Sequence, residues 1–409
     1  MDQTIKSSMV NLLNYVKENV SFYNKILQNI DVDNSVESVY EALPYMTKAM
    51  MRDSGEHINQ SINETNAELV VKLTGGTTGE PWNITKTQGE STSYFCMLWK
   101  SRLQFGIKPG DHFYQFGGYG DIDGEYTTQQ VIVVTPYTEL SMFHLNNEVL
   151  DRYIELIQQG NGNWFFANPS ALYILALRMK DRGIKGIGKI KYVELTGERV
   201  YDYQEELIKE VFNCPVSIMY GSREITTISH RCKYGSHHIL PHLYIETIDN
   251  EEKVIDYQND KQLGEVVITS FIDKYMPFIK YKTGDYAVIQ RKDDCPCGRK
   301  GLVFEQLLGR VPAYAEVDGN KINMEITYYL MEKFNRTYGS GIRQFQAIFK
   351  KPNIFRFRIV VESPDICEMV CQFYDKELKA VIPNIKVEVE FVDIIERSKR
   401  KLNPFIIED

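Results

Sequence analysis

The chain has 409 residues, which is more than one hydrophobic core usually serves, so we expect a large domain and at least one smaller one. Hydrophobic residues make up 43% and charged residues 25%, an ordinary globular composition that excludes extended disorder. A net charge of -8 supplies no basic field to neutralise phosphates, so we expect no nucleic-acid partner.

The N-terminal segment 1–20 is amphipathic with charges throughout, which fits neither a signal peptide nor a membrane span. No later stretch is apolar enough to cross a bilayer, so we expect no membrane partner. Seven cysteines, an odd number in a large chain without a secretion signal, indicate a reducing compartment, and we expect a cytoplasmic protein. Cys96 and Cys214 are interpreted as core residues.

The first 60 residues predict helices, because apolar residues recur at helical spacing on both sides of a break at Pro44. From about residue 68, short strand-like runs alternate with helical stretches, which predicts βαβ units and a parallel sheet. After residue 240 the strands follow one another without long helices, so we expect an antiparallel or barrel-like subdomain there.

The segment 307–323 combines glycine, proline and turn residues and predicts a domain boundary. Beyond it, a helix, two strands, a second helix at about 365–380 and a last strand at 387–394 predict a small α+β domain. We therefore expect an α/β protein whose large N-terminal domain, 1–309, has mixed and parallel sheets with helices plus a β-rich subdomain. A small, mobile C-terminal domain would occupy 310–409.

A loop rich in glycine and threonine directly follows the predicted strand 67–72 and is the sharpest local signal in the chain. Its glycines let backbone N–H groups turn toward an anion, and its threonine hydroxyls add donors. The Gly-Lys-Ser/Thr ending of a Walker A loop is absent. We interpret the loop as a phosphate cradle, with an ordinary polar turn as the alternative. Its residues are Thr74, Gly75, Gly76, Thr77, Thr78 and Gly79.

This loop resembles the phosphate loop of the adenylate-forming superfamily, which includes acyl- and aryl-CoA ligases. Other motifs follow in order: 220–224 resembles the YGxTE segment of that superfamily, 281–285 its YxTGD segment, and 309–310 the start of its hinge. Within the superfamily, segments 43–52 and 264–285 resemble phenylacetate-CoA ligases, CapK-type capsule-biosynthesis proteins and coenzyme F390 synthetases. The matches extend from residue 43 to about residue 401.

The resemblance implies roles for particular residues. Glu224 would hold Mg²⁺ at the ATP phosphates, and Asp285 would accept the ribose hydroxyls, two tasks that suit carboxylates. Arg310 would contact the nucleotide. The turn at Gly197 and Glu198 would meet the adenine, although a plain turn that closes a strand would look identical. The implied nucleotide set also contains Tyr220, Gly221 and Ser222, and the implied catalytic set contains Thr77 and Glu224.

A second constellation consists of Cys232, His238, Cys295 and Cys297. Three thiolates and an imidazole form a complete tetrahedral set for a structural Zn²⁺, and some proteins of the phenylacetate-CoA ligase branch carry zinc at a similar pattern. Unligated residues in surface loops are the alternative. Three other histidines compete for the imidazole position, and we prefer His238 because its spacing from the first cysteine matches the family. The competitors are His230, His237 and His242.

A basic run at 397–401 lies near the C-terminus. In the family, a lysine on the last loop of the small domain reaches the substrate carboxylate and the α-phosphate, where a mobile charge stabilises the transition state. Lys401 fits the family register best and completes the implied catalytic set, with Lys399 as its rival. A solvated basic turn is the alternative.

The resemblance implies an ATP- and Mg²⁺-dependent enzyme that adenylates a small organic acid and then transfers the acyl group, most simply to CoA. The aromatic content of 12% would suit an aryl acid. At the hinge, this chain has Pro312 where relatives commonly have an aspartate. Proline restricts the backbone torsion that would serve as the pivot for rotation of the small domain. The acceptor of the acyl group in the second step is therefore left open. Amide or ester formation, carrier-protein loading and a non-catalytic nucleotide-binding scaffold are the alternatives, and a homodimer is one option because close relatives are often dimers.

Overall fold

The structure, a computed structural model, describes residues 1–28, 35–59, 67–73, 82–117, 131–134, 136–142, 145–258, 261–310, 315–317, 320–322, 324–339, 341–395 and 405–408. The chain divides into two compact units, each built from two separate stretches of sequence. Unit 1 contains residues 1–109 and 217–311, and unit 2 contains residues 110–216 and 312–409. Within the described ranges, no helix combines the length and the apolar character needed to cross a bilayer.

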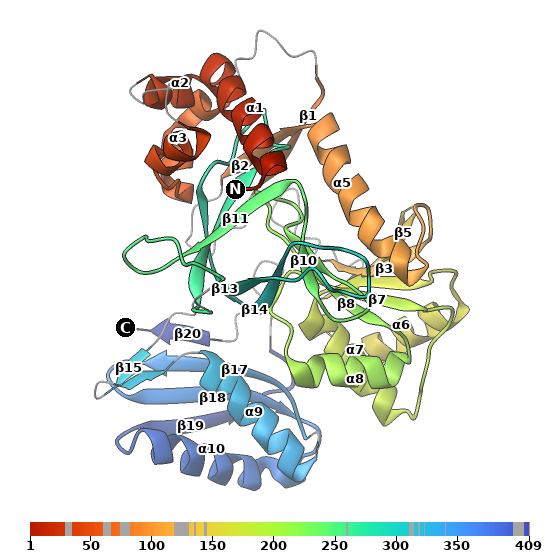
Figure 1. Ribbon diagram of the computed structural model, residues 1–409. Helices are drawn as coiled ribbons and strands as arrows, with labels where there is room; N and C mark the ends of the chain where they lie inside the picture. Colours follow the sequence, from red (N-terminus) through yellow and green to blue (C-terminus); the bar gives the residue numbers. More distant parts are fainter. Residues whose placement is uncertain are drawn as a thin grey trace. The chain divides into compact units, whose positions relative to one another are not determined.

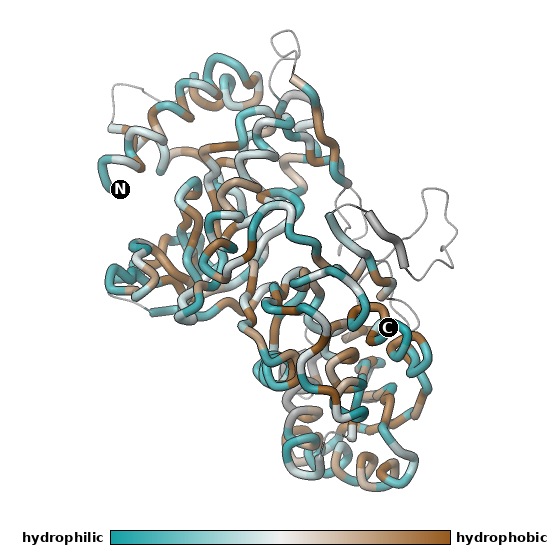
Figure 2. The backbone as a smooth tube through the Cα atoms, turned by 90° about the vertical axis from the view of Figure 1, so that its right-hand side faces the viewer, coloured by the Kyte–Doolittle hydropathy of each residue, from teal (hydrophilic) through white to brown (hydrophobic). Residues whose placement is uncertain are grey.

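Unit 1 begins with helices, as the periodicity predicts (Figure 1). They are α1 (Gln3–Asn19), α2 (Ser21–Leu27), α3 (Val36–Ala42), α4 (Lys48–Asp53) and the 3-10 turn η1 (Gly55–Ile58). Asp2 caps α1 by accepting a hydrogen bond from the backbone N–H of Ile5 at 2.9 Å. Hydrophobic and hydrophilic stretches alternate along these helices (Figure 2), as expected for helices that bury one side.

An antiparallel hairpin follows, formed by β1 (Leu69–Leu73) and β2 (Asn83–Thr87), and it leads into α5 (Gln88–Arg102) and η3 (Leu103–Phe105). Thr87 and Glu90 form a capping box at the start of α5. The glycine- and threonine-rich loop 74–79 connects the two strands of this hairpin and lies outside the described residues.

The second stretch of unit 1 is β-rich, and its strands lie in the order β11-β12-β13-β14-β10-β9-β8. Every pairing described among these strands is antiparallel, which confirms the antiparallel alternative predicted after residue 240. The strands are β8 (Val216–Tyr220), β9 (Ser229–Arg231), β10 (His237–Ile239), β11 (Leu243–Ile248), β12 (Gly264–Ser270), β13 (Tyr281–Arg291) and β14 (Leu302–Arg310).

The first stretch of unit 2 has strands in the order β7-β6-β3-β5-β4, and all of its described pairings are parallel except that of β4 with β5. This confirms the predicted βαβ pattern. The elements are β3 (Phe113–Gly117), β4 (Val131–Val134), β5 (Tyr137–Ser141), α6 (Asn147–Gln159), β6 (Trp164–Ala167), α7 (Pro169–Asp181), β7 (Tyr192–Leu195) and α8 (Asp202–Phe212).

The second stretch of unit 2 is a four-stranded sheet in the order β19-β18-β17-β20, with two helices packed on it (Figure 1). The predicted last strand ends at Phe391 as β19, but a further strand, β20, follows it and pairs with β17 in parallel. The elements are β15 (Ala315–Val317), β16 (Asn320–Ile322), α9 (Met324–Tyr338), β17 (Ile342–Lys350), β18 (Ile354–Val361), η4 (Pro364–Ile366), α10 (Cys367–Val381), β19 (Lys386–Phe391) and β20 (Phe405–Glu408).

One core prediction is wrong. Cys96 lies on the exposed side of α5, because the neighbouring Tyr94 is the residue that this turn of the helix buries. Cys214 is only partly buried.

Candidate functional site

A tight turn follows β8 and carries the predicted Tyr220–Glu224 segment. A Cβ atom on Gly221 would lie 2.0 Å from the carbonyl oxygen of Thr226, so this position excludes any larger residue. Thr226 adopts a φ of 54°, and its neighbour Ile225 donates its N–H to Ser222 Oγ at 3.1 Å. The turn thus fixes the backbone that leads from β8 to Glu224.

Glu224 is buried, and a neighbouring phenol holds its carboxylate. Burial raises the pKa of Tyr281, and the negative charge of Glu224 and the hydrogen bond between the two side chains raise it further. Tyr281 therefore stays protonated and donates to the carboxylate. A fixed carboxylate oxygen is the hard ligand that Mg²⁺ requires, and a single protein carboxylate is sufficient when substrate phosphates and water complete the shell. Glu224 fits the implied metal role.

Asp285 and Arg310 face each other across β13 and β14, where they are paired in register. The hydroxyl of Tyr220 donates to Asp285 Oδ2 at 2.6 Å, and Arg310 Nε lies 4.0 Å from Asp285 Oδ1. Burial and the charge of Asp285 raise the pKa of Tyr220, so its phenol remains a donor. The Asp285 side chain is 16% exposed, so the carboxylate is oriented and still accessible to a diol.

Lys86 on β2 and Asp273, between β12 and β13, form a buried ion pair. Their side chains are 2% and 1% exposed. The hydroxyl of Tyr94 also donates to Asp273, and the Lys86 ammonium lies 4.9 Å from the centroid of the Tyr94 ring. Glu90 accepts the backbone N–H groups of Lys274 and Tyr275 at 2.7 and 2.8 Å. The start of α5 and the end of the β1–β2 hairpin are therefore tied to segment 270–275.

The ion pair between Lys86 and Asp273 was not predicted. A lysine in a short strand and an aspartate 187 residues later carry no local pattern that would connect them. The only sign that Lys86 is buried is its position in β2, two residues after Ile84, because alternate residues of a strand point to the same face.

The four predicted zinc ligands come together in unit 1. The ligand atoms of Cys232, His238, Cys295 and Cys297 all lie within 4.8 Å of one another. Cys232 Sγ lies 3.7 Å from Cys295 Sγ, and Cys297 Sγ lies 3.2 Å from His238 Nε2. Bonds of about 2.0–2.3 Å to a tetrahedral zinc would separate ligand atoms by roughly 3.3–3.8 Å. The donor set and its spacing fit a structural zinc.

Two similar turns present the cysteines. Gly235 donates its N–H to the carbonyl of Cys232, and Gly298 donates its N–H to the carbonyl of Cys295, both at 2.9 Å. Both glycines have φ values above 80°, which favours glycine at these positions. Burial opposes ionisation of Cys295, but its hydrogen bonds with Ser236 and the neighbouring cysteines lower its pKa to about 7. A thiol with this pKa is readily available as a metal-binding thiolate.

The rival histidines make other contacts. The hydroxyl of Ser229 and Nδ1 of His237 are 2.7 Å apart, and the ring of His242 meets Tyr94 edge-on at 4.8 Å. His230 lies 6.0 Å from the ring of Phe105.

In unit 2, Gly197 and Glu198 follow β7. Gly197 adopts a φ of 82°, and a Cβ atom there would lie 2.8 Å from Asn168 Nδ2. The carboxylate of Glu198 accepts the N–H of Ser170 at 3.2 Å, so it contributes to the start of α7. The site residues that lie outside the described ranges are Thr74, Gly75, Gly76, Thr77, Thr78, Gly79, Pro312, Lys399 and Lys401.

Comparison with solved structures identifies the class of fold. The chain aligns over its whole length with a 2-hydroxyisobutyryl-CoA ligase in its postadenylation state, with a TM-score of 0.76, 14% identity and 89% of that chain covered. It also aligns over 81% of its length with an anthranilate CoA ligase in complex with anthranoyl-AMP, with a TM-score of 0.55, 14% identity and 65% of that chain covered. The chain has the fold of the adenylate-forming ligases, and the predicted fold class is confirmed.

Two curated relatives show which adenylate-forming proteins the chain resembles in sequence. The chain is 24% identical over 307 residues to the phenylacetate-coenzyme A ligase of Thermus thermophilus and 22% identical over 305 residues to the protein CapK of Staphylococcus aureus. Each alignment covers 73% of this chain, and they span 68% and 65% of the two relatives. No protein-family model matches the chain. The resemblance to the phenylacetate-CoA ligase and CapK branch of the adenylate-forming superfamily is confirmed.

Proposed function

We propose that this protein is an ATP-dependent ligase that adenylates a small organic carboxylic acid and transfers the acyl group to the thiol of CoA. One observation carries the proposal. Asp285 and Glu224, on separate parts of unit 1, are each held by a tyrosine phenol within the adenylate-forming fold. Carboxylates fixed in this way suit a nucleotide ribose and its metal ion.

In the first step, a carboxylate oxygen of the substrate attacks the α-phosphorus of ATP. The bond between the α-phosphorus and the bridging oxygen breaks, and pyrophosphate leaves with that oxygen and its electron pair. Asp285 accepts the ribose hydroxyls, and Arg310, which is 52% exposed beside it, contacts the nucleotide. Mg²⁺, when bound at Glu224, neutralises phosphate charge. Catalysis here consists mainly of positioning and electrostatic stabilisation.

In the second step, the CoA thiolate attacks the acyl carbon and AMP leaves. The relatives support this acceptor, because they include two CoA ligases solved with acyl-AMP and a phenylacetate-coenzyme A ligase. Lys401, within a small domain at 310–409, completes the proposed catalytic set. We propose an aryl acid as the class of substrate. We also propose that the protein is a cytoplasmic homodimer.

The experiment that tests the function measures pyrophosphate release from ATP and Mg²⁺ across a panel of aryl, fatty and amino acids, with and without CoA. We expect release that depends on one class of acid, and a faster turnover with CoA that yields an acyl-CoA product. Acid-dependent release without any response to CoA would reject the acceptor and favour an amine, an alcohol or a carrier protein. Nucleotide binding without release for any acid would favour the scaffold alternative.

The four-ligand cluster supports a second proposal, that Cys232, His238, Cys295 and Cys297 hold one structural Zn²⁺. Three thiolates and one imidazole leave no open position, so the ion would take no part in the chemistry. Such an ion would join the turn after β9 to the connection between β13 and β14.

We expect purified protein to contain about one zinc per chain, and Cys295→Ser to lose it. Because metal-binding free energy adds directly to folding free energy, loss of the ion should lower the melting temperature by about 5 °C or more. Metal analysis and thermal unfolding measure the two effects. Cys96→Ser, on the exposed side of α5, is the matched control and should change neither. A zinc-free wild-type protein whose stability is insensitive to chelators would contradict the proposal.

A further inference from the structure

A buried lysine immediately precedes β13, in a backbone conformation that lysine rarely adopts. Lys280 has a φ of 48° and is 5% exposed. This left-handed φ is strained for a residue with a side chain, whereas glycine adopts it without strain. Strained residues cluster at functional sites, where the surrounding structure holds them in place. Because glycine would fit this backbone more easily, the lysine indicates that its side chain has a task.

The side chain of Lys280 connects β13 to the N-terminal helices. Its ammonium donates to the carbonyl oxygens of Glu41 and Leu43, at 3.1 and 2.8 Å, where α3 ends. The last carbonyls of a helix have no donors within the helix, and the helix dipole favours a cation beside them. The ammonium also lies 4.2 Å from the centroid of the Tyr45 ring. One side chain thus binds the end of α3 and the segment that follows it.

Backbone hydrogen bonds of Lys280 and its neighbours extend this connection. The N–H of Lys280 donates to Thr269 Oγ1 at 3.0 Å, and its carbonyl accepts the N–H of Met46 at 2.9 Å. The carbonyl of Met46 accepts the N–H of Lys282 at 2.9 Å, which completes a parallel bridge between Met46 and Tyr281. The first two residues of β13 are therefore fixed against the segment that follows α3.

The start of β13 is important because the strand leaves its regular pairing just beyond it. Between its pairs with β12 at Lys282 and at Tyr286, β13 contains three residues where β12 contains one. The three residues include Asp285, the carboxylate proposed to bind the ribose. A bulge of this kind redirects side chains, and the regular pairs on either side hold it. The position of Asp285 therefore depends on how the start of β13 is held.

We propose, on the basis of the adenylation function above, that Lys280 is a positioning residue for nucleotide binding. By joining the start of β13 to the end of α3, Lys280 fixes one side of the bulge and so the place where Asp285 accepts the ribose hydroxyls. Lys280 acts through Asp285 and does not touch the nucleotide. In this way the N-terminal helices support the nucleotide site.

Calorimetric titration of AMP into the whole chain tests the inference, at a temperature where every variant is folded. We expect Lys280→Met to raise the Kd for AMP about 10-fold, because a displaced Asp285 loses a charge-assisted hydrogen bond with the ribose. Lys280→Arg keeps the cation, so its Kd should stay within about threefold of the wild-type value. Lys280→Gly relieves the backbone strain but removes the side chain, so it should lose as much affinity as Lys280→Met.

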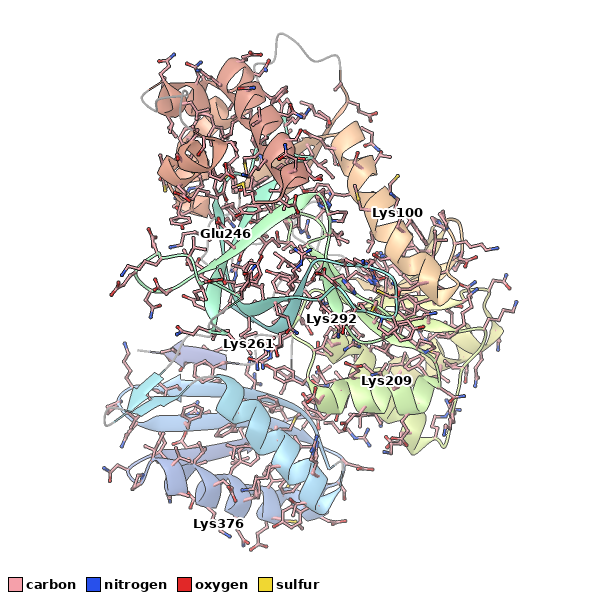
Figure 3. The ribbon with its side chains drawn as sticks, viewed as in Figure 1. Lys100, Lys209, Glu246, Lys261, Lys292 and Lys376 are labelled. Atoms are coloured by element: carbon pink, nitrogen blue, oxygen red, sulfur yellow. The ribbon has the colours of Figure 1, made fainter. Side chains whose placement is uncertain are left out.

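Two control variants separate positioning from general effects. Leu12→Ala removes buried volume from α1 and should lower the melting temperature by about 4 °C or more. Its Kd for AMP should nevertheless stay within about twofold of the wild-type value. Lys261→Met replaces a lysine of the same unit whose side chain is 62% exposed (Figure 3), and it should change neither quantity.

Four results would overturn the inference, and they differ in what else they reject. An unchanged Kd for AMP in Lys280→Met would reject the role of Lys280 and leave the proposed function intact. Wild-type affinity in Lys280→Gly would show that the backbone turn, and not the side chain, holds β13. A loss in Leu12→Ala equal to that in Lys280→Met would assign the effect to general destabilisation. A wild-type protein that does not bind AMP would reject this inference together with the adenylation function.

Discussion

Lys86→Met is expected to destabilise the protein by about 3–5 kcal/mol, because it leaves the Asp273 carboxylate buried without its counter-charge. Asp273 is 1% exposed, so water cannot replace the ammonium. Tyr94 would remain as a donor to the carboxylate, but a neutral phenol does not compensate a full charge. The shift in the midpoint of urea-induced unfolding measures the loss.

The double variant Lys86→Met with Asp273→Asn provides the control. It removes both charges and keeps an acceptor for Tyr94, so we expect it to recover most of the lost free energy of unfolding. If the double variant is as unstable as Lys86→Met, the loss comes from packing of the lysine stem and not from an unpaired charge.

Glu224→Gln is expected to lower acid-dependent pyrophosphate release by about 10²–10³-fold at saturating ATP. The amide keeps the volume of the side chain and its hydrogen bond with Tyr281, but it removes the negative charge that Mg²⁺ requires. The concentration of Mg²⁺ at half-maximal rate should rise as well. Initial rates measured over a series of Mg²⁺ concentrations check both effects.

Glu246→Gln is the matched control for Glu224→Gln. Glu246, on β11 of the same unit (Figure 3), also accepts phenol hydrogen bonds, from Tyr40 at 2.9 Å and Tyr244 at 3.3 Å. Its loss should affect stability and leave the rate of pyrophosphate release unchanged. Equal rates for the two variants, or an unchanged rate for Glu224→Gln, would reject the proposed role of Glu224 as a metal ligand.

Local patterns predicted much of the fold. Helical periodicity identified the N-terminal helices, and alternation of strands with helices identified the parallel pairings around β6. The four residues proposed to bind zinc were predicted from residue type, spacing and the family resemblance, and the structure brings their ligand atoms together. In each case the decisive information lies within short segments whose chemistry is distinctive.

Long-range pairings were not predictable in the same way. Lys86 and Asp273 are 187 residues apart, and only the folded hairpin shows that β2 directs a lysine inward. The last strand, β20, is four residues long and gains its partner β17 only through tertiary pairing. Cys96 was interpreted as a core residue, but it is exposed. The apolar residues of α5 do not gather on one face of the helix, so its sequence does not indicate which side packs.

The discontinuity of unit 1 has a consequence during protein synthesis. Its core joins residues of the first stretch, such as Met9 and Tyr94, with residues of the second, such as Phe278 and Phe304. A ribosome that adds about 5–20 residues per second needs roughly 10–40 s to travel from the end of the first stretch to Phe304. During that interval the nascent N-terminal helices display apolar side chains whose partners in the second stretch have not yet been synthesised. We therefore expect the emerging chain to be a substrate for ribosome-associated chaperones.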